Sequence, residues 1–169
     1  VRKAGGVYYT PQYIVNYIVD NTIVKLIEGK TPKEIAKLRF ADIASGSGSF
    51  LITVYERLID YHKHYYQQHP EQAKKDGCIQ FEGTYRLSLK QKQKILVNNI
   101  YGVDLDQQAV EVTQLSLYLK LLEDETTATA NDSWVMFKEK LLPDLNKNIV
   151  CGNSLIGTDI LNNQTSLPF

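Results

Sequence analysis

The stretch LRFADIASGSGSF, residues 38–50, decides the fold. Residues 38–44 form an apolar run of strand length that ends in Ser45-Gly46-Ser47-Gly48, and a pattern typical of a long helix follows from Ser49 to about Tyr66. Glycines in such a turn let a ligand approach the backbone, and the free N–H groups at the helix start can hold an anionic or electron-rich group. A Gly-x-Gly loop alone is equally compatible with a plain tight turn.

Strands and helices alternate along the rest of the chain. Residues 100–104 and 148–151 are predicted strands, and residues 10–27, 31–37, 88–98 and 107–122 are predicted helices. In the first helix, Thr10 is the expected N-cap and Pro11 the expected first helical residue. Its apolar positions 14, 15, 18, 19, 22, 23, 26 and 27 predict one buried face. The alternation predicts an α/β fold with a parallel sheet of three strands.

The predicted organisation has two parts. Residues 1–37 form an N-terminal helical segment, and residues 38–169 form a partial α/β domain with polar insertions at about 67–87 and 123–147. A short hairpin is expected around residues 79–85 of the first insertion. Three strands are fewer than a complete doubly wound sheet needs, so the chain is expected to be the front half of a larger domain.

Composition sets limits on function. The chain has 19 basic and 19 acidic residues and therefore no excess of positive charge. If the larger protein binds DNA, most of the DNA contacts are expected to come from its other parts. No apolar run approaches the roughly 20 residues that span a bilayer, and residues 1–6 resemble no targeting signal, which favours a cytoplasmic location. Cys78 and Cys151 match no zinc spacing and are expected to be free thiols.

Polar residues follow the second and third predicted strands. Asp104 ends the second strand, where a carboxylate can accept both hydroxyls of a ribose, and we expect it beside the glycine turn. A turn residue is the alternative for Asp104, and Asp106 is favoured as an ordinary N-cap. The side-chain amide of Asn153, after the third strand, can bond an adenine edge or serve only the turn.

Competing nucleotide sites fit the spacing poorly. The third glycine position of a dinucleotide fingerprint is occupied by Leu51, and Asp104 lies much further than about 20 residues beyond the loop. The Gly-Lys-Ser/Thr sequence of nucleoside triphosphate loops is absent from the 169 residues.

Taken together, these segments resemble the N6-adenine DNA methyltransferases of restriction–modification systems, most of all the Type IIG group, where methylase and nuclease share one polypeptide. The family's opening motif is matched by Tyr9-Thr10-Pro11. Its Asp-Pro-Ala-Cys-Gly-Ser-Gly-Ser-Phe-Leu is matched by residues 42–51, with Ile43 for proline and Ser45 for cysteine. Its later motifs are matched by residues 101–110 and by Gly-Asn-Ser-Leu at 152–155.

The resemblance implies a partial Rossmann-like fold that binds S-adenosylmethionine, with no metal. Thr10 and its neighbours, with Asp42, Ala44 and Gly46, would hold the methionine part of the cofactor. Asp104 would hold the ribose, Leu105 would press on the adenine, and Asn153 would bond its amino edge. The implied cofactor-binding residues are Tyr9, Thr10, Pro11, Asp42, Ala44, Ser45, Gly46, Gly48, Asp104, Leu105, Asn153, Ser154 and Leu155.

The resemblance also implies a site-specific DNA adenine-N6 methyltransferase that meets double-stranded DNA through the rest of a larger protein, with an endonuclease fused in that protein as one option. The family's acceptor motif, Asn-Pro-Pro-Tyr, is absent: the prolines stand at 11, 32, 70, 143 and 168. This chain alone is therefore expected to carry no catalytic residue and to be inactive. A methyltransferase of RNA or protein and a non-catalytic binding module are the alternatives.

Overall fold

The computed structural model describes residues 10–81, 83–123, 125 and 142–155. Its elements, in chain order, are α1 (Gln12–Val19), the π-helical turn η1 (Asp20–Val24), α2 (Lys25–Ile27), α3 (Pro32–Ile35), β1 (Phe40–Asp42), α4 (Ser49–Gln68), α5 (Pro70–Lys75), β2 (Ile79–Phe81), β3 (Thr84–Arg86), α6 (Leu89–Asn99), β4 (Ile100–Asp104), α7 (Gln107–Leu122) and β5 (Ile149–Cys151).

The central sheet has the order β1-β4-β5, and both pairings are parallel. Asp42 lies opposite Gly102, and Asp104 lies opposite Cys151, so the carboxyl ends of the three strands meet at one edge. This confirms the prediction of an α/β fold with three parallel strands. Strands β2 and β3 pair antiparallel in a separate two-stranded hairpin.

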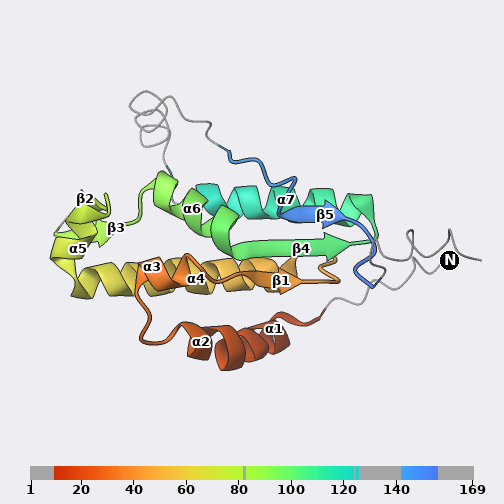
Figure 1. Cartoon of the computed structure of the whole chain (residues 1–169), viewed down its shortest axis with the longest axis horizontal. Helices are drawn as coiled ribbons and strands as arrows, with labels where there is room; N and C mark the ends of the chain where they lie inside the picture. Colours follow the sequence, from red (N-terminus) through yellow and green to blue (C-terminus); the bar gives the residue numbers. More distant parts are fainter. Residues whose placement is uncertain (1–9, 82, 124, 126–141, 156–169) are drawn as a thin grey trace, which may run out of the picture.

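Helices α4, α6 and α7 contact one another, and α4 and α7 contact the sheet. In Figure 1 the strands lie in front of α4 and α7, with α1 and α2 along the lower side of the molecule. Fully buried side chains from this layer and from the strands form the core: Leu51, Leu58, Ile100, Leu117 and Ile149. Burial of each such side chain contributes about 1.5–3 kcal/mol to folding, which fixes the helices against the strands.

The start of the N-terminal helix differs from the prediction. Pro11 has φ −55° and ψ 140°, an extended conformation, so it is the N-cap residue and α1 begins at Gln12. The carbonyl of Pro11 accepts the first helical hydrogen bonds, from the N–H groups of Ile14 and Val15. The prediction of Thr10 as a side-chain cap is therefore wrong by one position.

The buried face predicted for residues 10–27 is only partly present. Val15, Val19 and Ile27 are buried, whereas Ile18 is 40% exposed and Leu26 is 50% exposed. The reason is the π-helical turn over residues 20–24, whose wider turn breaks the 3.6-residue repeat on which the prediction depended.

The first insertion contains more structure than its polar composition predicted. The hairpin expected around residues 79–85 is confirmed by β2 and β3. Helix α5 was not predicted, although Pro70 occupies the first helical turn, where proline is favoured. Of the second insertion, residues 124 and 126–141 lie outside the described residues. Among the described residues, no helix is long and apolar enough to cross a membrane.

Candidate functional site

The loop between β1 and α4 turns sharply at two glycines. Gly46 and Gly48 have φ values of 52° and 83°, in the left-handed region that favours glycine. The N–H of Ser45 donates to the carbonyl of Val103 on β4 at 3.0 Å, and the N–H of Gly48 donates to the carbonyl of Ser45 at 2.8 Å. The loop is thereby fixed against the neighbouring strand. Ser45 is buried, and its hydroxyl faces the same Val103 carbonyl.

Thr113 of α7 forms a hydrogen bond with the other side of the loop. Its hydroxyl donates to the carbonyl of Gly46 at 2.9 Å. A Cβ on Gly48 would lie 2.7 Å from the Thr113 methyl group, so only glycine fits at position 48. A Cβ on Gly46 would meet nothing within 4 Å, so that side of the loop faces open space. Sequence patterns assigned Thr113 no role, because its contact with the loop spans 67 residues of the chain.

The Asp104 carboxylate lies directly against the glycine turn. Its Oδ2 accepts from the N–H of Gly46 at 2.7 Å, and its Oδ1 accepts from the N–H of Asp106 at 2.9 Å. Each oxygen keeps a further lone pair for a ligand. The structure thus brings together the acid and the turn that the sequence expected side by side. The Asp106 carboxylate caps α7 by accepting from the N–H of Gln108, as expected.

The residues after β5 fold back onto this edge. The N–H of Gly152 donates to the carbonyl of Asp104 at 2.8 Å, and the hydroxyl of Ser154 donates to the carbonyl of Ile43 at 2.8 Å. The side-chain oxygen of Asn153 accepts from the N–H of Leu155 at 2.9 Å, and its NH₂ group has no partner among the residues that the structure describes. Asn153 and Ser154 therefore join the same edge as Asp104.

Large apolar side chains are exposed at this edge. Leu105 is 73% exposed, Leu155 is 86% exposed, and Ile43 is 60% exposed. Single exposed apolar side chains are common on protein surfaces, so their value here is that all three follow strand ends of the same sheet edge. Leu105 and Leu155 are among the residues that the family resemblance implied for the cofactor site, whereas Ile43 stands where the family has proline.

A hollow of about 530 Å³ lies beside β1. Asp42 and Ala44 line it together with Ile18, Thr22 and Ile23 of the N-terminal helical segment. The last three had been assigned to a buried helical face; Ile18 is 40% exposed, whereas Ile23 is partly buried against the core. Thr10 is half-buried and Pro11 is exposed, and neither lines this hollow; Tyr9 lies outside the described residues.

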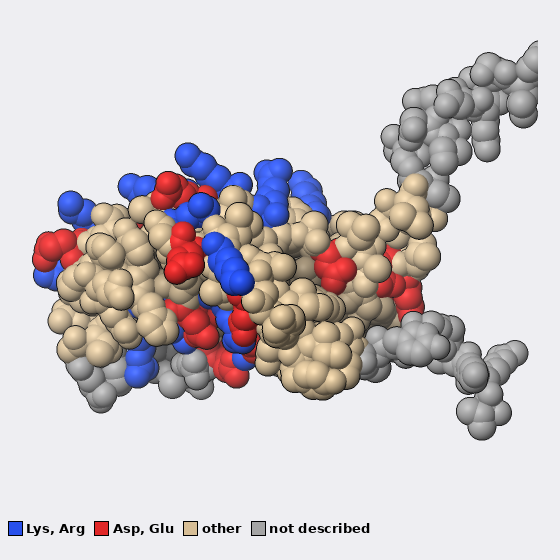
Figure 2. Space-filling model, turned by 90° about the horizontal axis from the view of Figure 1, so that it is seen from below, with Lys and Arg blue, Asp and Glu red and all other residues tan. Residues whose placement is uncertain are grey.

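The carboxyl ends of the strands carry acidic side chains. Asp42, Asp104 and Asp106 all lie at or just after strand ends. In Figure 2 the right-hand end of the molecule, where the strand arrows point in Figure 1, displays Asp and Glu but no Lys or Arg on the visible face. Within the described part of the chain, no group of three or more His, Cys, Asp or Glu side chains is arranged to hold a metal ion.

Comparison with known proteins gives one family. Residues 21–162 match the family model described as MmeI, DNA-methyltransferase domain. The chain is 40% identical over 147 residues to the Type II restriction enzyme and methyltransferase RM.Eco57I of Escherichia coli. This alignment covers 87% of this chain and 14% of that protein. The chain is 29% identical over 193 residues to the putative Type II restriction enzyme and methyltransferase RM.MjaORFECS2P of Methanocaldococcus jannaschii, covering 92% of this chain and 15% of that protein.

The chain thus spans about a seventh of the length of each relative. The matched residues include β1, the glycine loop, Asp104 and Asn153, so the match covers most of the candidate site. Since the family model covers most of the 169 residues, the chain belongs to the family of MmeI-type DNA-methyltransferase domains, as the resemblance to Type IIG restriction–modification enzymes predicted.

Proposed function

We propose that this chain is the S-adenosylmethionine-binding part of a site-specific DNA adenine-N6 methyltransferase in a restriction–modification enzyme. The observation that carries the proposal is the 2.7 Å hydrogen bond between the Asp104 carboxylate and the N–H of Gly46, at the ends of adjacent parallel strands. Ligands of open α/β sheets bind at this end of the strands. The adenine specificity rests on the resemblance of the motifs, and the link to restriction rests on the names of the two relatives.

The residues at this edge fit a nucleoside. Asp104 has lone pairs for the two ribose hydroxyls, and the exposed side chain of Leu105 offers an apolar surface for one face of adenine. The free NH₂ of Asn153 and its carbonyl oxygen can bond the polar edge of the ring. Ser154 and Leu155 would line the same side of the adenine site as Asn153.

The hollow beside β1 fits the methionine part. Asp42 and Ala44 line it, and the N–H groups in the first turn of α4, which begins at Ser49 directly after the glycine loop, can hold a carboxylate. The ammonium and sulfonium groups of the cofactor are positive, and the acidic strand ends attract them. Tyr9, Thr10 and Pro11 precede α1 and are proposed to close this side. When bound, the cofactor supplies an electrophilic methyl group, whose transfer depends on orientation more than on acid–base catalysis.

Two ligand experiments test the proposal. S-adenosylhomocysteine at 100 times its dissociation constant is expected to stabilise the folded chain by about 2.7 kcal/mol, measured by thermal unfolding.

The same ligand is expected to slow alkylation of Cys151, which is exposed with its thiol 3.5 Å from the Leu105 carbonyl. Cys78 is the internal control, since burial raises the pKa of its thiol and it accepts a hydrogen bond from Gln91 of α6 rather than contacting the strand ends. A folded chain with neither effect would reject the cofactor assignment.

DNA recognition is proposed to reside mainly in the rest of the larger protein. The chain has equal numbers of acidic and basic residues and lacks the Asn-Pro-Pro-Tyr sequence that binds the target base in the resembled family. We therefore expect the isolated chain to transfer no methyl group to duplex DNA. Incorporation of labelled methyl into DNA by the purified chain would contradict this expectation.

A further inference from the structure

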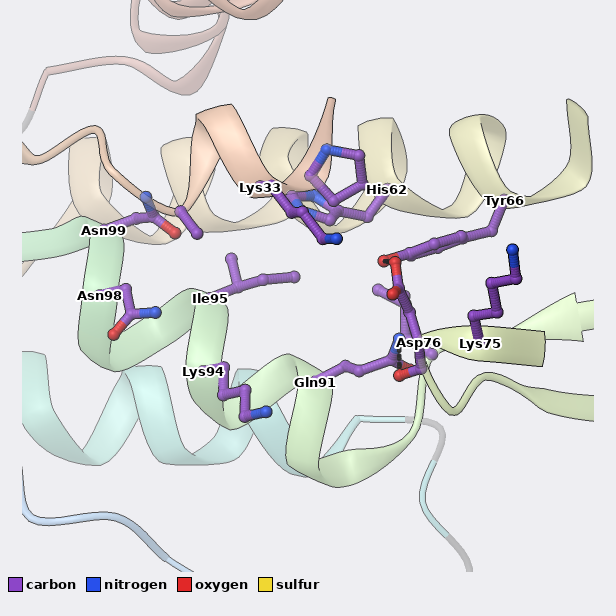
Figure 3. Close-up of a pocket in the computed structure, with 13 residues that line it drawn as sticks. Lys33, His62, Tyr66, Lys75, Asp76, Gln91, Lys94, Ile95, Asn98 and Asn99 are labelled. Atoms are coloured by element: carbon purple, nitrogen blue, oxygen red, sulfur yellow. Dashed lines mark hydrogen bonds between the residues drawn. The ribbon is translucent and has the colours of Figure 1, made fainter. Parts of the chain in front are cut away.

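A second hollow lies away from the proposed cofactor site. It has a volume of about 380 Å³ and is enclosed by α3, the last turns of α4, the end of α5, and α6 (Figure 3). Helix α4 starts at the glycine loop with Ser49, and His62 of the same helix lines this hollow. At 1.5 Å per residue, the two places are roughly 20 Å apart along α4. A ligand in this hollow would therefore be separate from the cofactor.

Three lysines from three different elements surround the hollow. Lys33 belongs to α3, Lys75 to α5 and Lys94 to α6, and Figure 3 shows them around the same space. All three are exposed, and in the described ranges none of them has an ion pair or a hydrogen bond. Other lysines of the chain do pair, for example Lys63 with Asp60 and Lys74 with Glu71.

The single carboxylate that lines the hollow is already occupied. Asp76 accepts hydrogen bonds from the hydroxyl of Tyr66 at 2.9 Å and from the side-chain amide of Gln72 at 2.8 Å. With three lysines against one aspartate, the lining carries an excess of two positive charges. A dianion would match this charge.

The floor of the hollow contains a buried polar group. His62 is 5% exposed, and its Nδ1 lies 2.7 Å from the carbonyl of Leu58. A carbonyl only accepts, so Nδ1 carries the hydrogen and Nε2 keeps a free lone pair. Burial lowers the pKa of His62, which favours the neutral ring. Among the described residues Nε2 has no partner, and no buried side-chain nitrogen or oxygen is left unbonded, so Nε2 is accessible from the hollow.

We propose that this lysine pocket binds the phosphate of a small, nucleotide-sized ligand. Lysine is a common partner of phosphate, and the excess of two positive charges in the lining matches a dianionic phosphate monoester. The volume lies within the usual range for small-molecule sites and exceeds the needs of a phosphate ion alone. Leu87, Ile95 and the ring of Tyr66 give the organic part an apolar floor. The backbone of DNA also carries negatively charged phosphate groups. A DNA duplex, however, would contact only the exposed lysines around the hollow and would not reach its buried floor.

The test measures binding of uridine 5′-monophosphate to the whole 169-residue chain by calorimetry, with uridine and a short duplex DNA as comparison ligands. A pyrimidine nucleotide is chosen because an adenine nucleotide could enter the proposed cofactor site. The test variant combines Lys33→Gln, Lys75→Gln and Lys94→Gln. The control variant combines Lys63→Gln, Lys74→Gln and Lys147→Gln, and it removes the same number of positive charges from outside the lining of the hollow.

The expected result is binding of uridine 5′-monophosphate but not uridine, weakened at least about tenfold in the test variant and unchanged in the control. If the affinity for uridine 5′-monophosphate falls equally in both variants, the binding reflects general attraction of anions, and the proposed phosphate site is wrong. Equal binding of uridine and its phosphate, or no binding of either, would also overturn it. Binding of duplex DNA alone, lost only in the test variant, would assign the lysines to DNA and overturn the small ligand.

Discussion

At the scale of single residues, Asp104 and Asp106 have the same side chain and different roles. The Asp104 carboxylate accepts from the N–H groups of Gly46 and Asp106, whereas the Asp106 carboxylate accepts from the N–H of Gln108 at the start of α7. We expect Asp104→Ala to abolish binding of S-adenosylhomocysteine while the fold survives. Asp106→Ala should lower stability by about 1 kcal/mol through loss of the cap and leave affinity unchanged. Calorimetry and urea unfolding measure both, and retained affinity in Asp104→Ala would reject the ribose role.

The two glycines of the loop give a second residue-level comparison. Both have positive φ, but a Cβ on Gly48 would meet Thr113 at 2.7 Å, whereas one on Gly46 would meet open space. Gly46→Ala should cost about 1–2 kcal/mol for its left-handed conformation. Gly48→Ala should cost about 1–3 kcal/mol more, because the added methyl displaces Thr113. Equal losses in urea unfolding would contradict the packing described here.

At the scale of elements, a buried ion pair joins α6 to the segment after α7. Lys92 lies 2.7 Å from Glu125, with side chains 9% and 11% exposed, and it also donates to the carbonyl of Glu123. Lys92→Met is expected to destabilise the chain by about 3–5 kcal/mol, since Glu125 would remain buried without a partner. Lys120→Met is the matched control: its pairs with Glu56 and Glu123 are more exposed, and its loss should cost about 1 kcal/mol or less. A Lys92→Met variant as stable as the control would show that the pair contributes little.

The elements also show what the sequence could predict. The glycine loop, β4 and α7 follow from local signals, namely apolar runs, glycines and an Asp106 cap. The π-helical turn at 20–24 could not be predicted this way, because its sequence fits an ordinary amphipathic helix equally well. The contacts of Thr113 with the loop and of Lys92 with Glu125 depend on tertiary packing over 67 and 33 residues, and no local pattern encodes them.

At the scale of the whole molecule, the two proposed sites of the described structure differ in charge. The carboxyl ends of the strands carry the acidic residues Asp42, Asp104 and Asp106, which suit a cationic cofactor. The lysine pocket lies roughly 20 Å away along α4.

The division into residues 1–37 and 38–169 stays a prediction. Arg57 of α4 pairs with Asp20 at 2.7 Å, and Gln12 bonds Thr53, so α1 and η1 are tied to α4.

The proposed function depends on one nucleoside site at the edge shared by β1, β4 and β5. The most direct measurement is a crystal structure of this chain with S-adenosylhomocysteine. We expect the ribose hydroxyls to lie within hydrogen-bonding distance of the Asp104 carboxylate, with adenine against Leu105 and the amino acid part near Asp42. Ligand bound elsewhere on the folded chain, with the Asp104 carboxylate contacting only Gly46 and Asp106, would contradict it.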